Sequence, residues 1–249
     1  MNVDVWNRRL VIIATDTKIE SLEQSEDGRA LLNNQQVQII PVKESEDFDK
    51  TYTILGGLRP QPGMLLMLSP YDDLTYVDVE DARTMIAVEK AALISRFCAL
   101  LGAKSVKVTN IKLVDNEKEK EISLNGQYSS ITGDIKIKNS QITNLKNQVN
   151  INAEFSGGEP NFTRADALLK SSRLNTDPFL KNLLEMAKDF EATNNKTLKI
   201  EQEVSLTQSL QNTFDLISNL DFPGGVIAVN YKSTAKEKIE IYFSLNIIF

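Results

Sequence analysis

Residues 79–113 read VEDARTMIAVEKAALISRFCALLGAKSVKVTNIKL, and their hydrophobic period changes at Gly102. Before Gly102 the apolar residues recur at spacings of three, four or seven, which predicts an amphipathic helix over residues 79–101. We expect Asp78 to be the N-cap of this helix and Gly102 to be the left-handed residue that ends it. The predicted apolar stripe consists of Ala82, Met85, Ile86, Leu93, Phe97 and Leu100. Such a stripe must pack against a sheet or another helix.

The segment after this helix alternates with a period of two, as strands do. Val106 and Val108 alternate with lysines, and Ile111 and Leu113 continue the alternation one step out of phase. A β-bulge at Thr109-Asn110 would produce this shift, because a bulge inserts one extra residue into a strand. Further alternating runs follow at Ile122/Leu124, Ile135/Ile137 and Val149/Ile151/Ala153/Phe155. We therefore expect a run of antiparallel strands.

The flanking segments supply further strands and helices. Short apolar runs predict strands in the N-terminal third, at residues 10–14, 37–42 and 64–68. Asp177 is expected to be the acidic cap of a second amphipathic helix that begins with Pro178. Residues 198–206 alternate as a strand, and residues 207–220 predict a shorter helix. The sequence thus predicts an α+β fold, with a predominantly antiparallel sheet and two or three amphipathic helices packed on it.

The run Gly157-Gly158-Glu159-Pro160 is the strongest boundary signal in the chain. It predicts an N-terminal α+β region over residues 1–156 and a C-terminal α+β region over residues 157–249. Helices and strands follow in a similar order on both sides, so the regions could be two similar α+β halves. One continuous domain is the alternative.

The C-terminal segment has the cleanest strand pattern. Its large apolar residues all share one parity, and they are Ile239, Ile241, Phe243, Leu245, Ile247 and Phe249. Such a face must be covered, either by the predicted helices or by a partner chain. We take these six residues as the candidate interaction site, because a terminal strand can offer an edge for pairing.

Composition excludes several classes of function. The chain has 28 basic and 34 acidic residues and no histidine, so it lacks both a concentrated positive charge for nucleic acid and the usual general base. Neither a Walker A loop nor a dinucleotide-binding glycine fingerprint occurs, and we expect no cofactor. The single cysteine, Cys98, and the absence of a signal peptide or a long apolar run predict a cytoplasmic protein.

A set of acidic residues is the best candidate for chemistry, and it consists of Asp72, Asp73, Asp78, Glu80 and Asp81. Clustered carboxylates could bind Mg²⁺ or Ca²⁺, so Asp72, Asp73 and Asp78 are candidate ligands of a carboxylate-metal enzyme. The structural alternative is that Asp72-Asp73 form a turn and the other three cap a helix.

Residues 123–155 suggest a different alternative. Their strands alternate apolar and polar residues, as strands do in a half-buried sheet and in a membrane-inserting hairpin. In outline, a helix followed by amphipathic strands resembles gasdermin-like and perforin-like pore-forming proteins. No motif accompanies the resemblance, so no residue's role is carried over from them. A membrane-active effector is therefore one alternative function, and membrane binding is expected only under it.

The leading hypothesis is a non-catalytic cytoplasmic protein that acts by protein-protein contact or by self-assembly. Its partner would be another protein or a second copy of the chain. It rests on the missing base, the missing cofactor loop and the apolar C-terminal strand.

Overall fold

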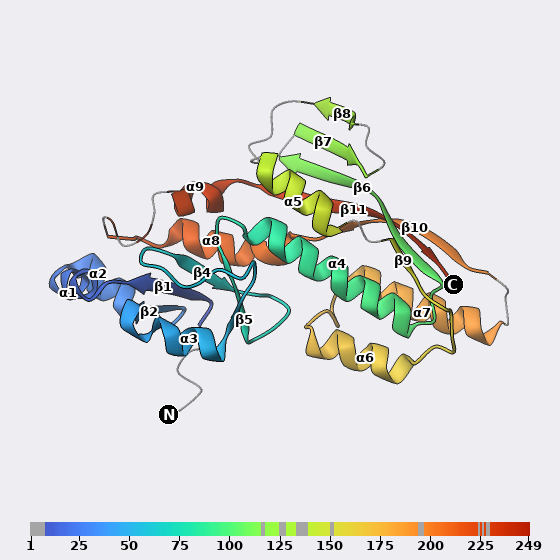
Figure 1. The fold of residues 1–249 in the computed structure, drawn as a ribbon, viewed down its shortest axis with the longest axis horizontal. Coiled ribbons are helices and arrows are strands. Elements are labelled where there is room, and N and C mark those ends of the chain that lie inside the picture. Colours follow the sequence, from blue (N-terminus) through green and yellow to red (C-terminus); the bar gives the residue numbers. More distant parts are fainter. Residues whose placement is uncertain are drawn as a thin grey trace. The chain divides into compact units, whose positions relative to one another are not determined.

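The structure, a computed structural model, describes residues 8–115, 118–124, 128–132, 139–149, 152–193, 197–223, 225, 227 and 230–249. It confirms the predicted α+β class, with helices and two sheets in which most of the strand pairs are antiparallel (Figure 1). The chain divides into two compact units, Met1–Met85 with Ser209–Glu237, and Ile86–Gln208 with Lys238–Phe249. Gly157 and Gly158 lie within the second unit, and the domain boundary expected there stays a prediction.

The first unit is built on a mixed sheet with the strand order β2-β1-β4-β5-β3. Its strands are β1 (Leu10–Ala14), β2 (Val37–Pro41), β3 (Thr53–Ile54), β4 (Leu65–Leu68) and β5 (Thr75–Asp78). Strand β1 pairs in parallel with β2 and antiparallel with β4. All five residues of β1 are buried, as expected for an unbroken apolar run in the middle of a sheet covered on both faces.

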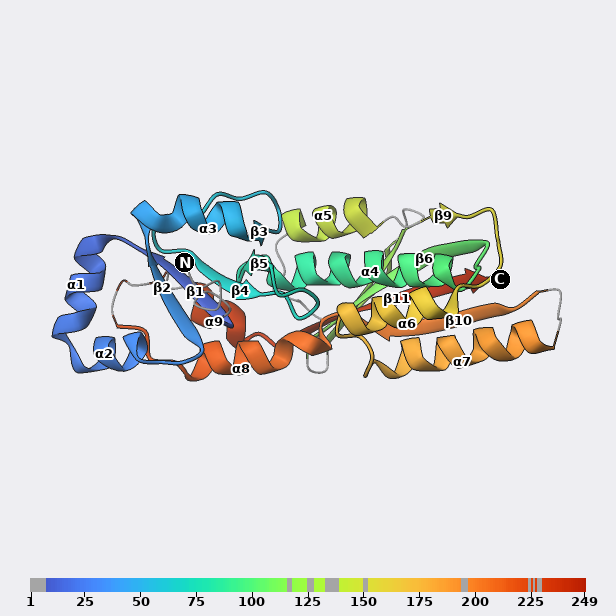
Figure 2. The same cartoon turned by 90° about the horizontal axis from the view of Figure 1, so that it is seen from below.

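Helices cover both faces of this sheet (Figure 2). They are α1 (Asp16–Gln24), α2 (Glu26–Leu32), α3 (Ser45–Thr51), α8 (Gln211–Asn219) and α9 (Asn230–Lys236), with a short 3-10 turn at Val42–Glu44. Helix α3 packs on one face through Phe48, whose ring centroid lies 5.2 Å from that of Tyr76. Helices α8 and α9 lie on the opposite face.

The segment Ser209–Glu237 is bound to the first unit by polar contacts that are distant in sequence. The guanidinium of Arg83 donates hydrogen bonds to the carbonyls of Thr234 and Glu237, and it lies 4.1 Å from the centroid of the Phe214 ring. Arg83 is only 8% exposed, so these contacts satisfy a buried charge.

The second unit contains an antiparallel sheet with the order β10-β11-β6-β7-β8, and β9 pairs with β6. Its strands are β6 (Ser105–Asp115), β7 (Lys118–Ser123), β8 (Tyr128–Thr132), β9 (Asn152–Glu154), β10 (Lys199–Ser205) and β11 (Ile239–Ile248). The predicted bulge is confirmed: Ser244 and Leu245 of β11 face Asn110 and Val108, which leaves Thr109 as the extra residue.

Four further helices are α4 (Ala82–Leu100), α5 (Asn139–Val149), α6 (Phe162–Ser171) and α7 (Pro178–Ala192). The predicted long helix is confirmed as α4, and Gly102 has a left-handed φ of 83°. A Cβ at Gly102 would lie 2.5 Å from the carbonyl oxygen of Gly158, so glycine also permits a close approach of two backbone segments.

One strand prediction for this region is wrong in part. Val149 does not begin a strand but ends α5, because it continues a stripe of buried residues with Ile142 and Leu145 at helical spacing. Of the predicted strand that was to start there, the structure describes only β9. Ile135, Ile137 and Ile151 lie outside the described residues.

Asp78 is not the N-cap of α4. It is the last residue of β5, and helix α4 begins four residues later, at Ala82. Its Oδ1 accepts a hydrogen bond of 2.8 Å from the backbone N–H of Glu80, two residues on. The carboxylate therefore stabilises the turn between strand and helix, as aspartate commonly does.

Candidate functional site

The site that stands out is one edge of the second unit's sheet, formed by β10. Strand β10 pairs with β11 on one side, and among the described residues no strand pairs with it on the other. An unpaired strand edge presents a row of N–H and C=O groups to which another strand can bind.

The hydrogen-bond pattern shows which residues of β10 present that edge. Leu206 donates its N–H to the carbonyl of Ile241, and Phe249 donates to the carbonyl of Leu198. The register between β10 and β11 has no shift, so even-numbered residues of β10 bond to β11 and odd-numbered residues point away from it. The outward residues are Lys199, Glu201, Glu203 and Ser205.

A groove runs beside this edge, between β10 and α7, which lie side by side (Figure 2). It consists of two hollows of about 360 and 320 Å³ that share Phe179, Asn182 and Gln202 in their lining. The second hollow is also lined by Leu183, Met186 and Ile200, which make its wall partly apolar. Backbone donors and acceptors thus lie next to a surface that can receive side chains, the arrangement used in strand addition.

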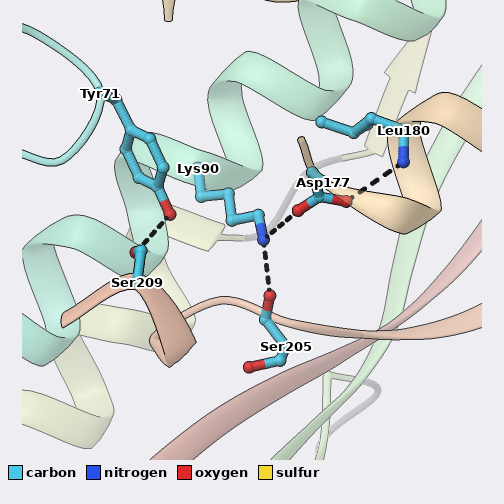
Figure 3. A network of polar contacts seen from close by, with 6 residues as sticks. All are labelled: Tyr71, Lys90, Asp177, Leu180, Ser205 and Ser209. Carbon is cyan, nitrogen blue, oxygen red and sulfur yellow. Dashed lines mark hydrogen bonds and ion pairs between the residues drawn. The ribbon is translucent and has the colours of Figure 1, made fainter. Parts of the chain in front are cut away.

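Lys90 of α4 closes one end of the edge (Figure 3). Its Nζ lies 2.7 Å from Asp177 Oδ2 and donates a hydrogen bond of 2.9 Å to the carbonyl of Ser205. Asp177 Oδ1 accepts from the N–H of Leu180, which confirms Asp177 as the predicted N-cap of α7. The side chains of Lys90 and Asp177 are only 9% and 13% exposed, so this ion pair is held between α4, α7 and β10.

The six residues predicted as an interaction site lie in the core of the second unit. Ile239, Ile241, Phe243, Leu245, Ile247 and Phe249 are between 0% and 4% exposed. Strand β11 lies between β10 and β6, and the ring of Phe249 packs against that of Phe190 on α7. The chain itself therefore covers this face, and the open edge belongs to the neighbouring strand.

The candidate metal ligands are engaged with protein groups. Asp72 accepts hydrogen bonds from the backbone N–H of Leu74 and from the Thr75 hydroxyl, which confirms the expected turn. Asp78 accepts from the Tyr231 hydroxyl at 3.2 Å, and Asp73 also has an electrostatic partner. Across the part of the chain that the structure describes, no three His, Cys, Asp or Glu side chains come together as a potential metal site.

Burial gives Asp78 an unusual protonation equilibrium. Asp78 is 7% exposed, and burial raises the pKa of its carboxyl, although the hydrogen bonds from Glu80 and Tyr231 act in the opposite direction. A raised pKa means that the folded state binds the proton more tightly than the unfolded state does. Asp78 therefore favours folding most strongly at low pH, and this contribution is lost as the pH rises through the folded-state pKa.

We expect Asp78→Asn to remove this pH dependence. An amide can still accept from Glu80 N–H and can donate to the Tyr231 oxygen, but it does not ionise. Relative to the parent, the variant should gain stability as the pH rises from near 3.8, the ordinary value for aspartate, toward neutrality. Urea unfolding at several pH values measures this. Parallel stability curves for the parent and the variant would contradict the assignment, and the exposed Asp47→Asn is the control.

The single cysteine and the segment 123–155 were also singled out in the sequence. The Cys98 side chain is fully buried, and burial raises the pKa of its thiol to about 12, so it is a structural residue. Residues 123–155 contain β8, α5 and β9. None of the helices within the described ranges combines the length and the apolar character needed to span a bilayer.

The sequence did not identify Lys90 or the β10 edge as a site. Residues 198–206 were predicted as a strand, and Asp177 as a helix cap, but both signals are local. Lys90 gave one usable signal, since it is a cation on the predicted apolar stripe of the helix, four residues after Ile86 and three before Leu93. Its partners lie 87 and 115 residues away along the chain, at Asp177 and Ser205.

Comparison with known proteins gives no relative from which a role could be transferred. No protein-family model matches the chain, and neither a curated protein nor a solved structure matches it. The function must therefore be argued from the residues and the geometry described above.

Proposed function

We propose that this protein acts without catalysis, by binding another protein through the outer edge of β10. The observation that carries the proposal is the row of outward backbone groups on Lys199, Glu201 and Glu203 beside the groove along α7. An extended strand could form main-chain hydrogen bonds with this row while its side chains enter the hollows. The predicted cytoplasmic location remains part of this proposal.

The composition of the edge favours a partner strand with matching charges over nonspecific hydrophobic contact. Charged side chains on a sheet edge discourage unspecific strand pairing, and Lys199, Glu201 and Glu203 are all exposed here. The carbonyl of Ser205 accepts a hydrogen bond from Lys90, and the carbonyl of Glu203 accepts one of 3.3 Å from the exposed Gln202 side chain. The buried contact of Lys90 limits pairing to the residues before Ser205. A partner strand must therefore match both the charges and the length of this short edge.

Replacing Glu201 by proline tests the proposal. The N–H of Glu201 points away from β11, so Glu201→Pro should remove an outward donor and leave the ladder to β11 intact. We expect a partner to bind at least about tenfold more weakly, since one hydrogen bond and close approach are lost. Glu201→Ala, which removes the same carboxylate but keeps the N–H, is the matched control.

The measurement compares proteins that co-purify with the tagged parent, the alanine variant and the proline variant, followed by titration of each identified partner. A tagged and an untagged copy of this chain are included, so that self-association is scored in the same experiment. The proposal requires at least one partner that the parent and Glu201→Ala retain and Glu201→Pro loses. If a folded proline variant retains every partner with unchanged affinity, the edge is not the contact surface.

A further inference from the structure

The charges along β10 select one particular strand as its partner. We infer that β10 pairs with β10 of a second copy, antiparallel and across a twofold axis at Ile200, which joins two sheets into one. This inference rests on the proposed function and names the occupant of the edge. It follows from the parity of the strand, from the order of its charges and from the position of Lys90.

Parity limits the possible registers. In an antiparallel pair, residues that exchange hydrogen bonds lie directly opposite each other, so outward residues of one copy must face outward residues of the other. The outward charged residues are Lys199, Glu201 and Glu203. A twofold axis can therefore place Lys199 opposite Lys199, Glu201 or Glu203 of the second copy, or it can place glutamates opposite glutamates.

The order of charges along β10 favours one of these registers. With the axis at Ile200, two Lys199–Glu201 pairs form between the copies, one on each side of the axis. No like charges are then directly opposite each other. With the axis at Glu201, Lys199 faces Glu203 on both sides of the axis, but the two Glu201 side chains also face each other. The remaining registers place two lysines or pairs of glutamates opposite each other. Opposite charges stabilise a directly opposed cross-strand pair and like charges destabilise it, so the axis at Ile200 is favoured.

Lys90 disfavours the registers shifted toward the end of β10. If the axis lay at Gln202 or Glu203, the carbonyl of Ser205 would have to accept a hydrogen bond from the second copy. That carbonyl already accepts one from Lys90 Nζ, whose ion pair with Asp177 is nearly buried. With the axis at Ile200, Ser205 takes no part in the pairing. The two Ile200 side chains then lie opposite each other beside the hollows lined by Leu183 and Met186.

Disulfide cross-linking of variants with one added cysteine tests the register directly. Opposed residues that do not exchange hydrogen bonds have Cα atoms about 4.5 Å apart, which a disulfide can bridge. Under mild oxidation, Ile200→Cys should therefore give a disulfide-linked dimer. Gln202→Cys is the matched control, since it would face Leu198 of the second copy and should stay unlinked. The native Cys98 is fully buried and does not interfere.

A charge exchange tests the same register without touching a buried residue. Glu201→Lys and Lys199→Glu should each weaken the dimer about tenfold, measured by sedimentation over a concentration series. The double variant Lys199→Glu/Glu201→Lys should restore it, because opposite charges again face each other. Within one chain, Lys199 Nζ lies 2.6 Å from Glu201 Oε1. The double variant exchanges these two charges and so keeps an ion pair between positions 199 and 201, which leaves the stability of the single chain unchanged.

The outcomes separate this inference from the proposed function. Cross-linking through residue 200 together with rescue by the double variant supports the twofold pairing. Cross-linking through Glu201→Cys or Gln202→Cys instead, or a parent that stays monomeric at every concentration, overturns it. If another protein then binds the parent but not Glu201→Pro, the proposed function stands with a different occupant. If Ile200→Cys loses its fold by circular dichroism, the charge exchange alone decides.

Discussion

A chain that lacks residues 243–249 should be unable to fold its second unit. The deletion removes Phe243, Leu245, Ile247 and Phe249, each at most 3% exposed. Burying four such side chains contributes about 6–12 kcal/mol, which is comparable with the whole stability of a domain. Because β11 lies between β10 and β6, the deletion also removes most of two strand ladders.

Solubility, near-UV circular dichroism and limited proteolysis measure the outcome of this deletion. We expect aggregation, or loss of the near-UV signal, and rapid cleavage within the second unit. Ser244→Ala is the control, since it alters the half-buried opposite face of the same strand and should leave the fold intact. A truncated chain with unchanged solubility and melting temperature would show that β11 is dispensable, contrary to its central position.

Lys90→Met should be the most destabilising single substitution near the proposed site, at about 3–5 kcal/mol. It leaves the Asp177 carboxylate, 13% exposed, without its cation and leaves the carbonyl of Ser205 without its donor. The cost arises mainly from an uncompensated charge in a poorly hydrated place. Urea denaturation gives the free energy of unfolding.

Two further variants test whether the loss of stability in Lys90→Met comes from the buried ion pair. Lys90→Met/Asp177→Asn should recover much of the loss, because the amide oxygen can still cap α7 at Leu180 without carrying a charge. Lys188→Met, which breaks the exposed pair with Glu185 on α7, should cost at most about 1 kcal/mol. If Lys90→Met is as mild as Lys188→Met, the buried ion pair does not hold α4, α7 and β10 together.

Local signals in the sequence predicted much of the fold. The change of period at Gly102, the bulge at Thr109 and the buried parity of β11 are each determined by residues within one or two elements. The N-cap at Asp177 was predicted for the same reason. The prediction failed at Val149, which fits an alternating run with later residues but shares a helical stripe with Ile142 and Leu145 earlier in the chain.

The candidate site could not be predicted in this way, because the order of strands in a sheet is a tertiary property. The sequence indicated that the C-terminal strand would belong to a sheet, but it did not indicate that β11 would be central and β10 at the margin. The contact of Lys90 with Ser205 likewise depends on segments that meet only in the folded chain. Asp78 shows the converse case. Its sequence position suggested an N-cap of the long helix, but its carboxylate accepts from the N–H of Glu80 in the turn after β5.

Amide hydrogen exchange along β10 tests the central claim most directly. The N–H groups of Glu201 and Glu203 point away from β11, whereas that of Gln202 points toward it and serves as an internal control. In the assembled protein, we expect Glu201 and Glu203 to exchange slowly, and after dilution to dissociation we expect them to exchange rapidly while Gln202 stays protected. Rapid exchange of Glu201 and Glu203 in the assembled sample would contradict strand pairing at this edge.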